Sequence, residues 1–227
     1  LPNSEPYGID DGDEAVDKNG RPIDIGKHVL VTYDWPYVRT PYKGILYRTS
    51  LPGILAGKLA AIPENIEPIG SVNGAVGPKV VANDKWSSSQ ISDLSFIRAI
   101  GLRRDEDTGQ SIVVQCKTAA HPSSDFSRIS TIRSVNRTLT GIRRIAKPYI
   151  GTPFSSTRLL SLQQAIDEFL RVERVAGFNQ GAVCTISYTR ADRIVGKLTL
   201  KLKMIPPFSL ETITIETSLA ADESELS

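Results

Sequence analysis

The chain has 227 residues, of which 40% are hydrophobic and 23% are charged, and its formal net charge is +2 at pH 7. Such values are ordinary for a globular protein, and they leave any strongly basic stretch as a local feature of the chain. Two cysteines are too few for a disulfide framework, no apolar run is long enough to span a bilayer, and no signal peptide is visible, so we expect a soluble protein, made in a cytoplasm, that does not insert into a membrane.

The length leaves room for one large domain or two small ones. Because the chain does not begin with Met, we expect it to be an interior piece of a longer protein. The residues before Gly26 are rich in Asp, Glu, Gly and Pro, and they predict a loop. Asp10, Gly12 and Asp13 have the spacing that opens a calcium loop, but the later ligands and the closing Glu are missing. A solvated loop is therefore favoured over a metal site.

The next hundred residues or so predict short strands alternating with helices. The two expected strands are short, β-branched apolar runs bounded by turn residues. The two expected helices have apolar residues at helical spacing, and Pro52 is acceptable in the first turn of the earlier one. In chain order we expect a strand at 29–31, a helix at 51–61, a glycine-rich surface loop at 70–86, a helix at 87–101, a charged turn at 103–109, a strand at 111–118 and a linker at 119–125.

The most informative stretch follows this linker, because no Asp or Glu occurs from Phe126 to Ile166. Apolar residues recur there at steps of three and four, which predicts an amphipathic helix that ends at Pro148 and Gly151. At about 100° per residue, four basic residues fall on the side opposite the apolar face. These residues, which are candidates for binding a partner, are Arg133, Arg137, Arg144 and Lys147. On the residues alone, a solvated face is the commoner explanation of such a charge run.

A second helix is expected after Ser155, Ser156 and Thr157, which are candidate N-caps, and Gly177 is a natural stop. The pattern then changes to alternation, which predicts strands at 183–189, 195–205 and 210–217 with residues 190–193 connecting the first two. In the second strand, Leu198, Leu200 and Leu202 face inward, and Pro206 and Pro207 end it. The tail from Asp222 to Glu225 is acidic.

Several of these features, taken in order, resemble contractile tail sheath proteins of bacteriophages and phage-tail-like particles. The C-terminal domain of that family has an Arg-rich helix, a "Pro-aromatic-hydrophobic-Gly" break, a second helix and alternating strands around a proline. Here the break is Pro148-Tyr149-Ile150-Gly151, and the strands are represented by Gly196-Lys197-Leu198-Thr199-Leu200, Pro206-Pro207 and Ile213-Thr214-Ile215. Pro22-Ile23-Asp24-Ile25-Gly26-Lys27 resembles a second family phrase, which leads into a central strand. Lys117-Thr118 stands where the family pattern has Arg-Thr.

The resemblance implies an α/β plus α+β protein. Residues 1–122 would be part of the family's subtilisin-like α/β domain, and residues 123–227 its C-terminal domain, a helical hairpin packed on a small β-sheet. It also implies a structural subunit that polymerises as a helical sheath around an inner tail tube protein and contracts to drive the tube through a cell envelope. Baseplate and tail terminator proteins would be further partners, the contractile tail of a virion its location, and the host bacterial cytoplasm its place of assembly.

On this basis the four basic residues of the first helix are expected to face the tube, because electrostatic contacts register surfaces and are remade at low cost. The last strand is a candidate for donation to a neighbouring subunit, because a short sheet with open edges accepts a strand. Pairing of that strand within its own subunit is the alternative. The residues concerned are Leu210, Thr212, Ile213, Thr214, Ile215, Glu216 and Thr217.

Two other classes of function are weaker. No catalytic constellation is visible: His28 and His121 have no nucleophile motif beside them, and the two Cys and two His lack zinc spacing. We therefore expect neither an enzyme nor a cofactor or metal. The arginine face is compatible with phosphate binding, so a nucleic-acid-binding protein is the alternative function. The near-neutral net charge and the lack of aromatic residues among the arginines make that alternative the weaker one.

Overall fold

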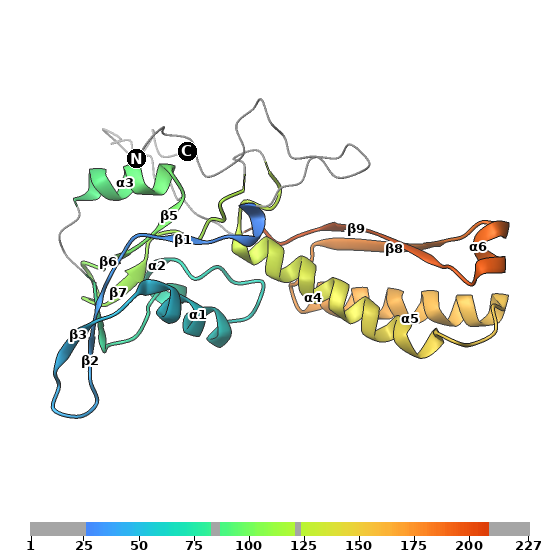
Figure 1. The fold of residues 1–227 in the computed structure, drawn as a ribbon, viewed down its shortest axis with the longest axis horizontal. Coiled ribbons are helices and arrows are strands. Elements are labelled where there is room, and N and C mark those ends of the chain that lie inside the picture. Colours follow the sequence, from blue (N-terminus) through green and yellow to red (C-terminus); the bar gives the residue numbers. More distant parts are fainter. Residues whose placement is uncertain (1–25, 83–86, 121–123, 209–227) are drawn as a thin grey trace, which may run out of the picture.

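A computed structural model describes residues 26–82, 87–120 and 124–208. The molecule is elongated, with a mixed α/β unit at one end and a long projection of two helices beside a β-ribbon at the other (Figure 1). We call residues 26–120 the first lobe and residues 124–208 the arm. The α/β plus α+β class expected from the sequence is confirmed. The predicted domain boundary between residues 122 and 123 lies outside the described residues and stays a prediction.

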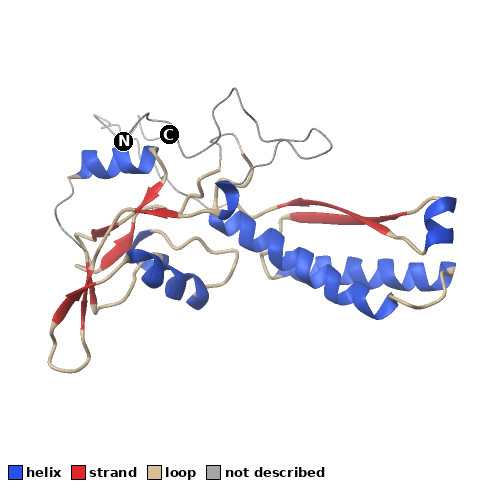
Figure 2. Cartoon of the chain, viewed as in Figure 1, coloured by secondary structure: helices blue, strands red, loops and turns tan. Residues whose placement is uncertain are grey.

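The first lobe is built from short strands and three α-helices (Figure 2). Strands β1 and β5 pair in parallel, β2 pairs antiparallel with both β3 and β4, and β6 pairs antiparallel with β7. In chain order its elements are the 3-10 turn η1 (Gly26–His28), β1 (Val31–Thr32), β2 (Tyr37–Arg39), β3 (Leu46–Arg48), α1 (Leu51–Ala61), α2 (Gly70–Asn73), β4 (Val80–Val81), α3 (Ser88–Phe96), β5 (Ala99–Ile100), β6 (Leu102–Arg104) and β7 (Ser111–Val113).

The core of this lobe forms where α1 lies over the ends of the central strands. Leu51 and Leu55 of α1 pack against Ile100, Val113 and other buried residues of the strands. The buried Asp34 carboxylate accepts hydrogen bonds from the backbone amides of Trp35 and Leu102. Burial raises the pKa of Asp34, and these two hydrogen bonds oppose that shift. A short polar connection thereby holds β6 close to the residues that follow β1.

The arm contains α4 (Ile129–Ala146), the 3-10 turn η2 (Lys147–Tyr149), α5 (Ser156–Val175), β8 (Gly181–Ser187), α6 (Arg190–Val195) and β9 (Thr199–Ile205). Strands β8 and β9 form an antiparallel ribbon in register from Gly181 opposite Ile205 to Ser187 opposite Thr199. The ribbon lies along one side of the α4–α5 hairpin (Figure 1). A second apolar core fills the space between them, with Ile142, Leu162, Ile166, Leu170 and Cys184 at its centre.

The sequence predictions for the helices and for β9 are confirmed in most places. The expected helix at 51–61 is α1, and the two expected helices of the arm are α4 and α5. Ser155 is the N-cap of α5 and accepts a hydrogen bond from the amide of Arg158 at 3.4 Å. Gly151 and Gly177 have φ of 81° and 80°, the left-handed region in which glycine is favoured. In β9 the half-buried residues alternate with exposed ones, as expected for a strand with one wet face.

Several predictions for the short elements of the first lobe were wrong. The expected loop at 70–86 contains α2 and β4, and the expected strand at 111–118 is β-structured only over β7. The first expected strand is β1, displaced toward the C-terminus, and Val29 is 45% exposed rather than buried. The β2–β3 hairpin was not predicted, because strands of three residues are too short to show alternation.

The expected helix at 87–101 ends at Phe96, and β5 follows it. The break coincides with a long-range contact of Arg98. Arg98 has φ of 59°, which a helix does not allow, and its buried guanidinium donates hydrogen bonds to the carbonyls of Thr118 and Ala120. In the arm, the expected connection at 190–193 is part of the short helix α6, and β8 is displaced toward the N-terminus from the expected strand at 183–189. Strand β9 ends where the strand expected at 195–205 does, but begins later, at Thr199. The loop expected before Gly26 and the strand expected at 210–217 lie outside the described residues.

Candidate functional site

The basic face of α4, which the sequence singled out, is divided between two environments. Its first arginine, Arg133, points into the first lobe, where Nη2 donates hydrogen bonds to the carbonyls of Leu59 and Ile62 at 2.6 and 2.9 Å. These carbonyls belong to the C-terminal end of α1, which carries the negative end of the helix dipole. Burial lowers the pKa of the Arg133 guanidinium, and the charge of Glu64 opposes that shift. Arg133 therefore caps a helix of its own chain.

The second arginine, Arg137, lies between two carboxylates. Its Nε donates to both carboxylate oxygens of Glu173 in α5 at 3.2 Å, and its Nη1 lies 3.1 Å from Oε2 of Glu64, which follows α1. Its guanidinium carbon lies 3.9 Å from the ring centroid of Phe178, the spacing of a cation–π contact. The Glu173 side chain is only 5% exposed, and Arg137 supplies the opposite charge beside it. Arg137 is thus a structural residue of the arm as well as a contact to the first lobe.

We call this set of contacts between the first lobe and the arm the joint. A hydrogen bond of 3.1 Å from the Asn65 side chain to the Gly177 carbonyl belongs to it as well. An open groove of about 510 Å³ runs along it, with charged residues of α4 and α5 in its walls and Phe169 at its side. The α4–α5 contact is close here, because a Cβ atom at Gly141 would lie 2.1 Å from Cζ of Phe169.

The other two predicted residues, Arg144 and Lys147, are exposed near the far end of α4. Neither makes an ion pair with another residue of the described ranges. The α4–α5 turn and α6 lie at the same end of the arm (Figure 1), and Phe154 of that turn packs edge-on against Tyr188 with ring centroids 5.0 Å apart. We call the end of α4, this turn and α6 the distal end. Its further exposed basic residues, which the sequence reading did not select, are Arg143, Arg158, Arg190, Arg193 and Lys197.

The distal end is apolar as well as basic. Ile150, Ile194 and Val195 are each 80% exposed, although large aliphatic side chains are normally buried. Asp192 is the one acidic residue among those of α6. Its carboxylate accepts hydrogen bonds from the hydroxyl and the amide of Thr189 in a capping box, and these bonds lower the pKa of Asp192. The surface therefore suits an acidic partner that also offers apolar contacts.

The β8–β9 ribbon is a second candidate surface. Within the described residues each of its strands pairs only with the other, so each has one edge open to a further strand. Lys201 and Lys203 lie on the exposed face of β9, while Leu200 and Leu202 pack toward the helices. The strand that the sequence selected for donation, from Leu210 to Thr217, lies outside the described residues.

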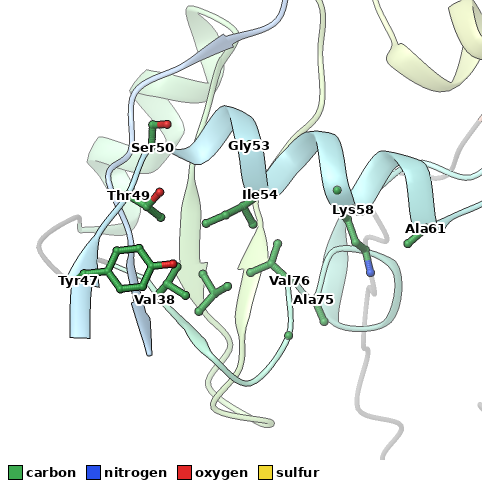
Figure 3. Close-up of a pocket in the computed structure, with 13 residues that line it drawn as sticks. Val38, Tyr47, Thr49, Ser50, Gly53, Ile54, Lys58, Ala61, Ala75 and Val76 are labelled. Carbon is green, nitrogen blue, oxygen red and sulfur yellow. The ribbon is translucent and has the colours of Figure 1, made fainter. Parts of the chain in front are cut away.

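A groove in the first lobe, drawn in Figure 3, is lined mainly by small and apolar side chains. It has a volume of about 610 Å³ and lies between α1 and the β2–β3–β4 sheet, with Ile54 and Val76 on its walls. Of the residues that the structure places around it, Lys58 is the one charged side chain. A single lysine provides no general acid–base pair, so the groove offers no catalytic arrangement.

No cluster of three or more His, Cys, Asp or Glu that could hold a metal ion occurs in the described part of the chain. His28 is exposed on η1, and His121 lies outside the described residues. The two cysteines are buried in separate cores, Cys116 in the first lobe and Cys184 in the arm. Among the residues that the structure describes, no helix is long and apolar enough to cross a membrane.

No protein-family model and no curated protein matches the chain. Solved structures do match it. A chain of the anti-feeding prophage (AFP) helical sheath in its contracted state has a TM-score of 0.72 and 18% identity over 91% of this chain and 61% of that one. A chain of the contracted PVC sheath complex, from an extracellular contractile injection system, has a TM-score of 0.70 and 16% identity over 88% of this chain and 57% of that one.

A chain from the six-fold symmetrised AFP baseplate structure also matches, with a TM-score of 0.69 and 18% identity over 86% of this chain and 55% of that one. At these identities the matches establish a shared fold. They confirm, at the level of the fold, the resemblance to sheath proteins that the sequence motifs indicated. The chain spans about three fifths of the length of the structures it matches.

Proposed function

We propose that this chain is the larger part of a structural subunit of a contractile sheath. Such a subunit polymerises around an inner tube and contracts to drive that tube through a cell envelope. The observation that carries the proposal is the fold that the chain shares, over 91% of its length, with a chain of the AFP helical sheath. The sequence motifs at Pro148–Gly151 and around β9 support it as well.

The proposed partners follow from this role. Copies of the chain form a helical sheath, and the inner tube protein, a baseplate and a tail terminator complete the particle. We place the subunit in the contractile tail of a bacteriophage or of a related injection particle, assembled in the bacterial cytoplasm. In a bacteriophage its contraction would lead to genome ejection into the host cell. The role is structural, and we assign no catalytic residue, metal or cofactor.

We assign the tube contact to Arg144 and Lys147 at the distal end, together with the exposed basic residues around them. Arg133 and Arg137, which the sequence reading placed in the same contact, use their guanidinium groups inside the subunit. Exposed charges such as Arg144 and Lys147, which have no ion-pair partner in the described part of the chain, can pair with an acidic tube surface and be released again at low cost. The three exposed aliphatic side chains of the distal end would add apolar contact area.

Charge reversal tests this assignment. We expect the full-length protein with Arg144→Glu and Lys147→Glu to fold normally and to lose tube-dependent sheath assembly, observed by negative-stain microscopy with purified tubes at low and high salt. Arg171→Glu with Arg174→Glu is a control of equal charge change on exposed positions of α5. Normal sheaths from the distal variant would contradict the tube contact. Loss of assembly in both variants would indicate a general effect of charge.

We also propose that residues 210–217 pair with the open ribbon of a neighbouring subunit. Among the described residues, β8 and β9 each have one edge without a paired strand. This supports the proposal, since an added strand satisfies the backbone groups of that edge. Deletion of all residues after Pro207 from the full-length protein should abolish polymerisation while leaving the helix content unchanged. If the truncated protein forms normal sheaths, the strand does not link subunits.

The nucleic-acid-binding alternative has no support from the fold. Half of the basic face that suggested it is engaged within the chain, through Arg133 and Arg137. A salt-dependent DNA titration separates the two functions. Binding with a steep salt dependence, by protein that fails to form sheaths around tubes, would favour the alternative.

A further inference from the structure

The first lobe and the arm have separate apolar cores, and polar groups make the contacts of the joint. No residue belongs to both buried clusters in the described part of the chain. Ile129, at the start of α4, packs against the core of the first lobe, whereas Ile142, near its end, lies in the core of the arm. Helix α4 therefore connects two bodies that each have an apolar core of their own, and the polar contacts of the joint lie between them.

These contacts differ in how easily they can break. The hydrogen bonds from Arg133 to the end of α1 are short, and two carbonyls share one guanidinium nitrogen. They lie one turn of α4 before Arg137 and close to Ile129, where the helix enters the first lobe. An arginine held in this way close to the start of the helix acts as a pivot, because movement of the far end of the arm displaces it little.

Arg137 makes one contact on each side of the joint. The carboxylate of Glu173 belongs to the arm, is 5% exposed, and receives the Nε donor through both oxygens. The carboxylate of Glu64 belongs to the first lobe, is 40% exposed, and is reached by a single nitrogen at 3.1 Å. Solvent and salt screen the exposed pair far more than the buried one. If the arm turns, the Glu64 contact separates first, and Arg137 remains with Glu173 and Phe178.

We propose that the Arg137–Glu64 ion pair is a salt-sensitive latch that fixes the orientation of the arm relative to the first lobe, with Arg133 as its pivot. The buried Glu173 carboxylate keeps the Arg137 guanidinium in place whether the latch is open or closed. The hydrogen bond from Asn65 to the carbonyl of Gly177 is a second contact across the joint. This inference does not depend on the proposed sheath function, because it rests on contacts within one subunit.

The latch is tested by a distance measurement between the two bodies. Spin labels at Val72→Cys in α2 and Leu160→Cys in α5 report the separation of the first lobe and the arm, and both positions are exposed. The native cysteines are buried, so they react slowly in the folded protein. Glu64→Gln removes the charge of the latch and keeps the shape of the side chain. Glu168→Gln is the matched control, since Glu168 pairs with Arg171 on the exposed face of α5, away from the joint.

We expect the distance distribution of the Glu64→Gln protein to be roughly twofold wider than that of the Glu168→Gln protein at low salt. Raising the salt from about 0.1 M to about 1 M, which shortens the screening length from ~10 to ~3 Å, should widen the distribution of the unsubstituted protein toward that of Glu64→Gln and leave Glu64→Gln unchanged. Equal distributions for the two variants at low salt, with unchanged circular dichroism, would overturn the proposal. So would an unsubstituted protein that does not respond to salt.

A second variant distinguishes loss of the Arg137–Glu64 ion pair from a general loss of structure at the joint. Glu64→Gln combined with Asn65→Ala should widen the distribution further, because both contacts to the far side of the joint are then absent. Both variants should keep the thermal stability of the unsubstituted protein, since each contact is exposed. A fall in stability without any change in the distance distribution would show that these groups support folding and do not set the orientation.

Discussion

Both halves of α4 carry basic residues on the same face, but the residues of the two halves make different contacts. In the first half, Arg133 and Arg137 meet carbonyl and carboxylate groups of their own chain. In the last turns, Arg143 and Arg144 are exposed, and Lys147 follows them in η2. The period of a helix determines which side chains share a face, but the role of each arginine depends on what the rest of the fold places opposite it. The first half holds the subunit together, and the second half is available to a partner.

The partners of the first half come from distant parts of the sequence. Leu59 and Glu64 precede the arginines by more than 70 residues, and Glu173 follows Arg137 by 36. An acid-free window from Phe126 to Ile166 therefore has its neutralising carboxylates supplied from outside it. Substitutions along α4 and at its contacts test this division. Their effects on the free energy of unfolding should become smaller from the joint to the distal end.

The largest effect should follow the loss of Arg137. In Arg137→Leu the Glu173 carboxylate stays buried without its cation, and we expect the free energy of unfolding to fall by about 2–3 kcal/mol. Arg144→Leu, the same change on the exposed half of the face, should alter it by less than about 0.5 kcal/mol. Urea unfolding followed by circular dichroism measures both. Equal losses in the two variants would remove the distinction between the halves.

The next largest effect on stability concerns the packing of α4 against α5. A methyl group at Gly141 would overlap the ring of Phe169, so Gly141→Ala should cost about 1–3 kcal/mol by forcing α4 and α5 apart. Gly57→Ala in α1 is the matched control, since nothing lies within 4 Å of a Cβ atom there. It should stabilise the protein by about 0.5–1 kcal/mol, as expected for alanine in a helix interior. If Gly141→Ala leaves the free energy of unfolding unchanged in the same urea measurement, the ring of Phe169 moves aside freely.

Alkaline pH should weaken the two cores unequally. Burial raises the pKa of the Cys116 thiol in the first lobe to about 12 and also raises that of Cys184 in the arm. The folded state keeps a proton that the unfolded thiol releases near pH ~8.5, so this contribution is complete below that pH and is lost as the pH rises toward 12. For Cys116 the free energy of unfolding should fall by up to about 1.4 kcal/mol per pH unit above ~9.

Urea midpoints measured at about pH 8 and about pH 10 show this dependence. Cys116→Ala should remove most of the slope, and Cys184→Ala should remove less of it. A slope that persists unchanged in Cys116→Ala would assign the alkaline loss to other groups, of which Tyr33 is one, because burial also raises the pKa of its phenol to about 12.

The smallest effect on stability is expected at the distal end. Arg144→Glu combined with Lys147→Glu changes exposed charges that have no ion-pair partner among the described residues, so the free energy of unfolding should change by less than about 0.5 kcal/mol. Thermal unfolding followed by circular dichroism measures this change. A loss comparable to that of Arg137→Leu would show that the distal charges support the fold and are not free for a partner.

The long elements were predictable because their periodicity is strong. Helices α4 and α5 show it clearly, and β9 alternates over seven residues. The two- and three-residue strands of the first lobe carry no such signal, and their pairing depends on neighbours that are distant in sequence. The helix expected through Arg98 ended early because a buried guanidinium held that residue at positive φ, a tertiary effect that no local pattern reveals.

The candidate site was predictable in part for the same reason. The basic face of α4 was visible from its spacing, but the joint was not, because Glu64 and Glu173 are ordinary acidic residues in the sequence. The distal end could have been found more completely. Ile194 and Val195 follow Arg193 directly, and Arg190 precedes it, so the basic and apolar residues of α6 are adjacent in the chain.

The length of α4 gives the joint a mechanical consequence. From Arg133 to its end at Ala146 the helix is a rod of about 20 Å at ~1.5 Å per residue, so a rotation of about 10° at Arg133 would sweep the far end through about 3.5 Å. The helix therefore converts a small rotation at Arg133 into a larger displacement at its far end. A rotation too small to disturb the pivot would displace the positive charges at the end of α4 by about the length of a hydrogen bond, so in the proposed latch the Arg137–Glu64 ion pair limits where those charges can reach.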